Sequence, residues 1–301
     1  MRRARITLPF HSRLDLFVIL KFMIENIAQS LKSFLPTQPP KIYKPIGCCI
    51  YCGKTENLST EHVIPLGLGG KIKLPKSSCV KCSKITSAFE ETCQRTMYGP
   101  LRLLYDLPSR RKKKRPKKLK LKVKRSHSDD WTYIDVDQEK YPFLILFPYF
   151  SMPKIHQTNP TLNGAKTKRL WIRGASPSYN FELLLAQLTN ELKVYSIMPE
   201  AKTHVEEFCQ MLAKIGYSFA VGELGFGSFT PFLIPHIINK EMNDSDKYIG
   251  SLDEDEKATE NLHEISIINT NQNDFVTVRI RLLAKLGTPT YYVVVGIFNK
   301  G

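Results

Sequence analysis

The stretch that decides the fold runs from Cys49 to Cys82 and contains two short cysteine pairs. Cys49-Ile50-Tyr51-Cys52 and Cys79-Val80-Lys81-Cys82 are both C-x2-C motifs, and 26 residues separate them. Each such turn brings two thiolates to one ion, and four thiolates at about 2.3 Å complete a tetrahedral zinc site. The two pairs therefore predict a structural zinc held by Cys49, Cys52, Cys79 and Cys82. Cys48 could replace Cys49 only with the less regular C-x3-C spacing.

Between the two cysteine pairs lies a second motif, in which a carboxylate directly precedes a histidine. Residues 58–71 read LSTEHVIPLGLGGK, with Glu61 and His62 followed by two β-branched residues, a proline and a Gly-Gly pair. Taken together, these features resemble the HNH endonuclease family, the ββα-metal fold, over residues 49–91. The likeness is greatest to the subgroup in which a Lys-Ile-Thr helix start, here residues 84–86, follows the second pair.

The resemblance implies metal-dependent hydrolysis of DNA phosphodiester bonds. A histidine with a pKa near 6.5 suits the base that deprotonates water, and a divalent cation neutralises charge developing on the phosphate. By resemblance, His62 is the general base. Glu61 is the ligand of a catalytic Mg²⁺ or Mn²⁺, since carboxylate oxygens suit hard cations. The zinc would hold the hairpin against the helix and take no part in catalysis.

The chain departs from the family pattern at two positions. The residues before the second cysteine pair, 74–78, contain no asparagine, and Ser83 stands where the family carries Asn or His as a second ligand of the catalytic metal. Glu90 and Glu91 follow Ser83 by two helical turns, about 10 Å, which we expect to be too far for direct substitution. These departures leave an alternative open. The chain would then be a catalytically degenerate zinc-knuckle protein with a nucleic-acid-binding or regulatory role.

The charge of the chain is concentrated in one segment. The 301 residues include 44 Lys and Arg against 28 Asp and Glu, a formal charge of +16, and twelve of the basic residues lie in residues 110–125 without an acid. Such a run is often a solvated linker, but laid along DNA it would release condensed counterions. The residues that we expect to contact DNA, of unknown strandedness, are Lys71, Arg110, Arg111, Lys112, Lys113, Lys114, Arg115, Lys117 and Lys118. From Lys118 to Lys124 lysines alternate with apolar residues, which predicts an edge strand protected by its lysines.

The expected architecture is α+β, with four segments. These are an N-terminal amphipathic segment (1–44), the zinc-stapled, treble-clef-like ββα module (45–108), a basic linker (109–125) and a larger α+β domain of unknown role (126–301). We expect a helix over 83–97, ended by Gly99-Pro100. An apolar stripe at steps of three and four predicts another helix over 203–225. Strands are predicted over 263–269, 275–286 and 290–298, forming an antiparallel sheet on which Arg279 and Arg281 line one basic face.

Composition and cysteine usage limit the remaining possibilities. Hydrophobic residues make up 42% of the chain and charged residues 24%, which excludes global disorder. No apolar stretch reaches the roughly 18 residues of a membrane span, so no membrane partner is expected. Five of the seven cysteines cluster between residues 48 and 82, and there is no convincing secretory signal. This pattern favours metal binding in a reducing compartment and a cytoplasmic location. Homodimer formation stays open.

Overall fold

The computed structural model describes residues 40–109, 115–156, 171–175, 181–239, 244–251, 257–268 and 274–299. All of the described residues belong to one compact unit, within residues 36–301. Residues 1–39 of the predicted N-terminal amphipathic segment and residues 110–114 of the basic run lie outside the described residues. Among the helices of the described part, none has the length and apolar character needed to cross a membrane.

The motif stretch folds as a β-hairpin followed directly by a helix. Strand β1 (Leu58–His62) pairs antiparallel with β2 (Lys73–Cys79), and helix α2 (Val80–Thr92) begins at the next residue. A short 3-10 turn, η1 (Leu66–Leu68), lies in the connecting loop, where Gly69 adopts φ +86°. On α2 the buried positions are Cys82, Thr86 and Phe89, a spacing that gives the helix one buried face. The ββα arrangement and the α+β class predicted from the sequence are confirmed.

The helix after the second cysteine pair differs from the expectation at both ends. It begins at Val80 and passes at Cys93 into a π-helical turn, η2 (Cys93–Met97). Gly99 and Pro100 do not end it; they open the next helix, α3 (Gly99–Leu104). Proline is tolerated in a first helical turn because the N–H it lacks has no partner there.

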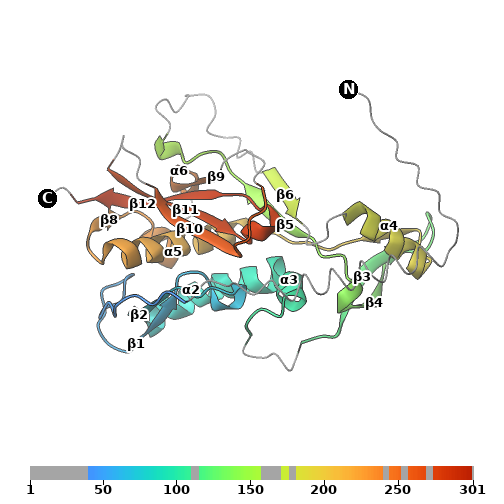
Figure 1. Cartoon of the computed structure of the whole chain (residues 1–301), viewed down its shortest axis with the longest axis horizontal. Coiled ribbons are helices and arrows are strands. Elements are labelled where there is room, and N and C mark those ends of the chain that lie inside the picture. Colours follow the sequence, from blue (N-terminus) through green and yellow to red (C-terminus); the bar gives the residue numbers. More distant parts are fainter. Residues whose placement is uncertain are drawn as a thin grey trace. The chain divides into compact units, whose positions relative to one another are not determined.

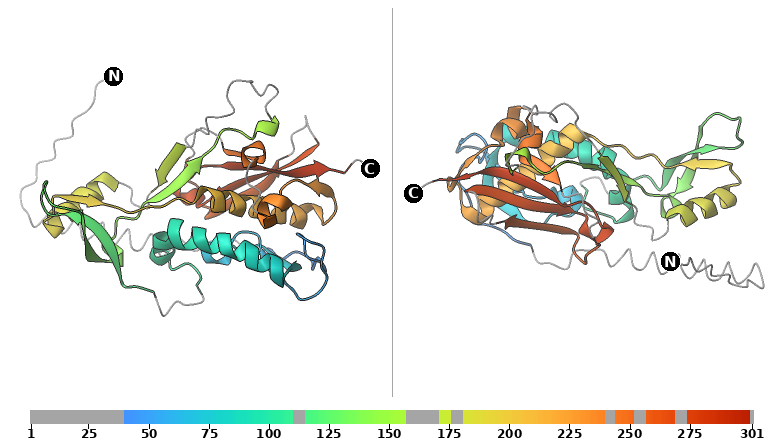
Figure 2. Two further views of the ribbon diagram at one scale, coloured as in Figure 1. Left: turned by 180° about the vertical axis from the view of Figure 1, so that it is seen from behind. Right: turned by 90° about the horizontal axis from the view of Figure 1, so that it is seen from above.

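The second half of the basic run forms a strand, but it is a central one. Strand β3 (Lys118–Lys124) lies between β4 (Thr132–Asp137) and β7 (Ser196–Met198), antiparallel to both. The expectation of an edge strand was therefore wrong. Helix α4 (Phe181–Leu192) covers one face of this sheet (Figure 2), where Leu121, Val123 and Leu188 are buried in one cluster.

The C-terminal sheet is antiparallel, as expected. Its order is β10 (His263–Ile268), β11 (Phe275–Leu282), β12 (Tyr291–Phe298) and β8 (Phe229–Pro231), and β9 (Ile249–Ser251) pairs with the beginning of β12. A 3-10 turn, η7 (Ala284–Leu286), connects β11 to β12. Nearby, β5 (Ile145–Tyr149) pairs with β6 (Trp171–Ala175). Short helical turns complete the chain: η4 (Gln138–Lys140), η5 (Lys154–His156), η6 (Pro235–Asn239) and α6 (Ser245–Tyr248).

The predicted basic face of β11 is not a surface for DNA. Arg281 is only 1% exposed, and its guanidinium donates to the carbonyl oxygens of Thr288 (2.9 Å) and Lys257 (2.7 Å). Arg279 is bound to the Glu264 carboxylate at 3.1 Å. Both arginines therefore serve the internal structure of the sheet, Arg279 in a salt bridge and Arg281 as a buried donor to backbone carbonyls.

Helix α5 (Val205–Leu224) lies between the C-terminal sheet and the ββα module (Figure 1), and every residue from 208 to 221 is buried. Toward the sheet, Phe208 packs edge-on against Tyr291, and Gly216 lies so close to β12 that a Cβ there would be 3.1 Å from Val293 and Val295. Toward the module, the Tyr217 hydroxyl donates to the Ile50 carbonyl at 2.6 Å. A helix buried on both sides joins the module to the sheet. The domain boundaries drawn from the sequence stay a prediction.

His263 joins the module to the sheet at a second place. The Leu283 N–H donates to its Nδ1 at 3.2 Å, so Nε2 carries the proton and donates to the Leu68 carbonyl at 2.8 Å. Burial lowers the pKa of this imidazole to about 4, from an ordinary value of 6.5. The neutral ring makes both hydrogen bonds, whereas protonation of Nδ1 would break the bond from Leu283.

The lowered pKa of His263 predicts a loss of stability in mild acid. Because the folded pKa lies below the unfolded one, the contribution is complete above pH 6.5 and is lost as the pH falls toward 4, in total about 3 kcal/mol. Chemical denaturation at several pH values measures it. His263→Gln should lose correspondingly less unfolding free energy over this range than the parent. His127→Gln, at an exposed position, is the control. Equal pH slopes for His263→Gln and the parent would contradict the assignment.

Candidate active site

The four predicted zinc ligands come together at the start of the hairpin and of α2. The sulfur atoms of Cys49, Cys52, Cys79 and Cys82 all lie within 4.8 Å of one another, and the Cys52 and Cys79 sulfurs are 3.6 Å apart. Thiolates at 2.3 Å around a tetrahedral ion are separated by about 3.8 Å, so the cluster could hold zinc with little movement. The cluster uses Cys49 rather than Cys48, as the C-x2-C spacing predicts.

The first knuckle is closed by backbone hydrogen bonds that need a glycine. The Gly53 N–H donates to the Cys49 carbonyl at 2.8 Å, and the Cys49 N–H donates to the Lys54 carbonyl at 2.7 Å. Gly53 adopts φ +75°, a conformation that side chains disfavour. The second knuckle straddles the junction of β2 and α2. A metal bound to all four sulfurs would tie the loop before β1 to the beginning of α2.

Glu61 and His62 lie on opposite faces of β1. Glu61 is buried, with 6% of its surface exposed, and His62 is half-buried. The Tyr51 hydroxyl donates to Oε2 of Glu61 at 3.3 Å, and Oε1 of Glu61 lies 2.7 Å from the ammonium of Lys214. The carboxylate assigned to a catalytic metal is thus bound by a cation of the protein itself.

Lys214, on α5, is fully buried among oxygen atoms. Its Nζ lies 2.7 Å from Oε1 of Glu90 as well as from Glu61, and it donates to the backbone carbonyls of His62 and of Val63, the latter at 3.3 Å. Burial alone would lower the pKa of Lys214, but the two carboxylates raise it above its ordinary value. The side chain is therefore an ammonium surrounded by four oxygens.

The cluster of Glu61, Lys214 and Glu90 carries more acid than base. Burial raises the pKa of Glu90; the ammonium of Lys214 opposes this effect, and the charge of Glu61 adds to it. One ammonium cannot neutralise two buried carboxylates, so a proton on Glu90 or a further cation would relieve the surplus negative charge.

The chemistry expected of His62 is compatible with its surroundings. Burial and the positive charges of Lys214 and Lys73 lower the pKa of His62, against a smaller opposing effect of Glu61. The imidazole is therefore neutral near pH 7 and able to accept a proton. Among the described residues its ring makes no hydrogen bond, which leaves both ring nitrogens available to a water molecule or a phosphate.

On helix α2 it is Glu90, and not Ser83, that shares a partner with Glu61. The Ser83 hydroxyl donates to the Val80 carbonyl at 3.1 Å, one turn earlier on the same helix. Glu90 instead reaches the ammonium that Glu61 also binds. Glu90 and Glu61 thus share one cation, although Glu90 follows Ser83 by two helical turns. That Glu90 is too far along the helix to replace Ser83 as a metal ligand stays a prediction.

The residues predicted to contact DNA have different surroundings. Lys71, Lys117 and Lys118 are exposed. Arg115 forms an ion pair with Asp106, donates to the Leu107 carbonyl, and keeps only 16% of its side chain exposed. Of this set, Arg110–Lys114 lie outside the described residues.

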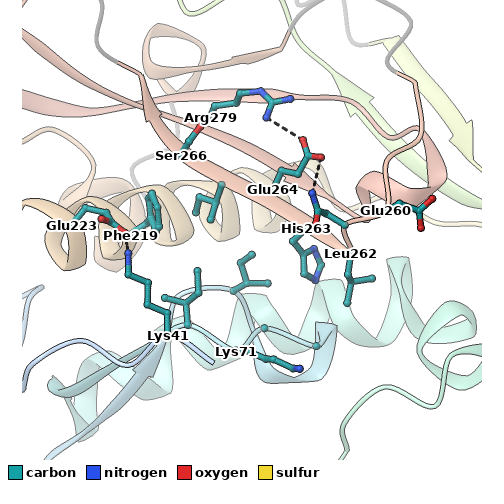
Figure 3. A pocket seen from close by; sticks show the side chains of 16 residues that line it. Lys41, Lys71, Phe219, Glu223, Glu260, Leu262, His263, Glu264, Ser266 and Arg279 are labelled. Carbon is teal, nitrogen blue, oxygen red and sulfur yellow. Dashed lines mark hydrogen bonds and ion pairs between the residues drawn. The ribbon is translucent and has the colours of Figure 1, made fainter. Parts of the chain in front are cut away.

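A cavity of about 440 Å³ lies beside the module, between its loop, α5 and β10 (Figure 3). Lys71 lines the cavity, but the other charged side chains that line it largely neutralise each other. Lys41 is paired with Glu223, and Arg279 with Glu264. Neither His62 nor the cysteine cluster lines this cavity, so it is not the predicted catalytic site.

Sequence reasoning missed the partners of Glu61. Lys214 stands 153 positions after Glu61 in the chain, and no local motif joins them. One signal was present: on the predicted helix, Lys214, Ser218 and Gly222 form a stripe of polar and small residues beside the apolar stripe. Such a stripe is compatible with a second packed face.

Comparison with known proteins gives one family. Residues 49–95, less than a sixth of the chain, match the HNH endonuclease family, which confirms the resemblance seen in the sequence. No curated protein shows significant similarity to the chain. No solved structure does so either.

The buried ammonium predicts a large effect of substituting Lys214. Lys214→Met leaves two buried carboxylates uncompensated and should lower the free energy of unfolding by about 3–5 kcal/mol. Lys247→Met, at an exposed lysine, should change it by less than about 1 kcal/mol. Adding Glu61→Gln and Glu90→Gln to Lys214→Met should restore part of the loss. A Lys214→Met protein as stable as the Lys247→Met protein in urea unfolding would contradict the charge cluster.

Proposed function

We propose that the chain is an HNH-type, metal-dependent endonuclease that hydrolyses DNA phosphodiester bonds, with His62 as general base. One observation carries the proposal. The segment that matches the HNH endonuclease family folds as a ββα unit in which a neutral, half-buried His62 directly follows a buried Glu61. Nuclease-type function is what the family match itself supports.

In this proposal His62 accepts a proton from the attacking water. Its lowered pKa keeps the ring unprotonated at neutral pH, as a base requires. The ammonium of Lys214 binds the backbone carbonyl of His62, which fixes the end of β1 where the imidazole is attached. The proposed general base, His62, and the side chain that holds its backbone, Lys214, thus come from distant parts of the chain.

Glu61 is the proposed ligand of a catalytic Mg²⁺ or Mn²⁺, with Ser83 as the second ligand. Bound there, the divalent cation would neutralise charge on the phosphate. The donors around Lys214 are carboxylate and carbonyl oxygens, the type that hard cations prefer. In this proposal Glu61 binds the divalent cation after the ammonium of Lys214 has released Oε1 of Glu61. Glu90, which contacts the same ammonium, is then a second carboxylate close to the cation.

The four-cysteine cluster is proposed to bind a structural zinc. Three of its cysteines are buried and Cys52 is exposed, and the four thiolates leave no coordination position for substrate. Thiolates of this kind persist in a reducing compartment, which supports a cytoplasmic location as a proposal. Homodimer formation stays a prediction.

The DNA contacts proposed from the sequence are Lys71, Lys117 and Lys118, which are exposed, together with residues 110–114. Arg115 is bound to Asp106 and would have to leave that ion pair to reach a phosphate. Lysines read phosphates and not bases, so these contacts would give affinity without sequence preference.

One specific observation favours the alternative, a degenerate module that binds nucleic acid without cutting it. The ammonium of Lys214 holds the oxygen of Glu61 that a catalytic metal would need. A permanent ammonium at this place would supply positive charge but would leave no position for a metal and its water. The two functions differ in whether DNA is cleaved.

Incubation with supercoiled plasmid, with and without Mg²⁺ or Mn²⁺, distinguishes the nuclease from the protein that binds DNA without cutting it. We expect metal-dependent nicking or linearisation by the parent and a loss of at least about 100-fold in His62→Ala, the size typical of a missing general base. His127→Ala, at an exposed histidine, should cut like the parent. Each protein's zinc content should be unchanged, which excludes loss of the fold. Gel retardation by the parent without any cleavage would establish the degenerate alternative.

A further inference from the structure

The three-stranded sheet of β3, β4 and β7 has one covered and one open face. On the covered face, Leu121, Val123 and Val136 are buried in the cluster with Leu188 of α4. Residues directly opposite in an antiparallel pair share a face, so the register of Lys122 with Tyr133 and with Met198 places these three on the other face. Tyr133 is 51% exposed and Met198 is 40% exposed, which shows that this face is open.

The open face combines lysines with aromatic rings. Lys120, Lys122 and Lys124 alternate along β3, Tyr133 lies on β4, and Trp131 is the residue directly before β4. Lysines on an edge strand are explained as protection against pairing with another sheet, but β3 is central and has partners on both sides. Edge protection therefore does not account for three lysines on this face.

The positive charge is available next to Trp131. The ammonium groups of Lys122 and Lys124 lie 5.9 and 5.5 Å from the centre of its ring. Among the described residues neither lysine pairs with an acid, whereas Lys120, further along β3, is bound to Asp135 at 3.0 Å. The end of the face that carries Trp131 is thus the more basic end, and exposed Arg125 continues it.

We propose that this open face, with Trp131, Tyr133, Lys122 and Lys124 at its centre, binds single-stranded polynucleotide. Aromatic rings that stack on bases, beside ammonium groups that bind phosphates, are the means by which proteins bind single strands.

The spacing favours a single strand over a duplex. Lys122 pairs with Tyr133 and also lies over the Trp131 ring, so both rings are on the open face. They are two residues apart, about 6.8 Å in extended chain, whereas neighbouring nucleotides of a B-form strand rise about 3.4 Å. A base on each ring must therefore be unstacked from its neighbour. A duplex buries its bases in pairs and would offer this face only its backbone.

This surface does not depend on the proposed nuclease activity, and its test needs no cleavage. The chain has two tryptophans, so Trp171→Phe leaves Trp131 as the single tryptophan fluorophore. In this background, without divalent metal, titration with oligo(dT) should quench Trp131 emission, and oligo(rU) shows whether ribose is also accepted. A duplex of equal length should bind more weakly. Unchanged emission with oligo(dT), or tighter binding of the duplex, would overturn the proposal.

Variants of the face supply the second part of the test, read by fluorescence anisotropy of labelled oligo(dT). Trp131→Leu should weaken binding about tenfold or more, the effect of losing one stacked base. Lys122→Ala/Lys124→Ala should reduce the slope of log affinity against log salt by about 1.4, for two phosphate contacts. The double variant Lys140→Ala/Lys247→Ala removes the same charge elsewhere and should lower affinity less than the Lys122/Lys124 pair. Equal losses in both double variants would show a response to net charge alone and contradict the surface, and thermal unfolding verifies that each variant is folded.

Discussion

The buried ammonium of Lys214 is the interaction on which the arrangement of this chain depends. A lysine without solvent is tolerable only when anionic or carbonyl oxygens replace water. Here β1 supplies a carboxylate and a carbonyl, Val63 directly after it supplies a second carbonyl, and α2 supplies a second carboxylate. Both elements of the ββα module are thereby bound to one atom of α5. Removing either partner leaves a buried charge without compensation, so the module and α5 are energetically coupled.

This coupling places part of the predicted catalytic centre under the influence of the C-terminal half of the chain. Helix α5 packs on the C-terminal sheet with one side and holds Glu61 with the other. His263 adds a link from β10 to the loop of the module. A displacement of α5 would therefore change the surroundings of Glu61 and His62 together. The cysteine cluster lies at the other end of β2 from His62, where it supports the hairpin and the start of α2.

Much of the fold was predictable because local patterns determine it. The paired C-x2-C motifs located the cysteine cluster, and alternation of apolar residues located β3, β11 and β12. What failed depends on neighbours distant in sequence. Whether β3 is central or an edge depends on β7, more than 70 residues later, and Arg281 is buried because Thr288 and Lys257 offer it carbonyls. The partners of Glu61 were missed for the same reason, since no sequence spacing indicates that Lys214 and Glu90 lie beside Glu61.

The central claim is that the position beside Glu61, held by Lys214 in this structure, accepts a divalent cation for nuclease chemistry. Electron paramagnetic resonance of Mn²⁺ tests it in the His62→Ala protein with plasmid DNA present, so that the DNA is retained uncut. After subtraction of the signal from DNA alone, we predict a bound Mn²⁺ whose signal is lost when Glu61→Gln is added. Equal Mn²⁺ binding with and without the Glu61 carboxylate would contradict the claim and would mean that Lys214 keeps Glu61 permanently.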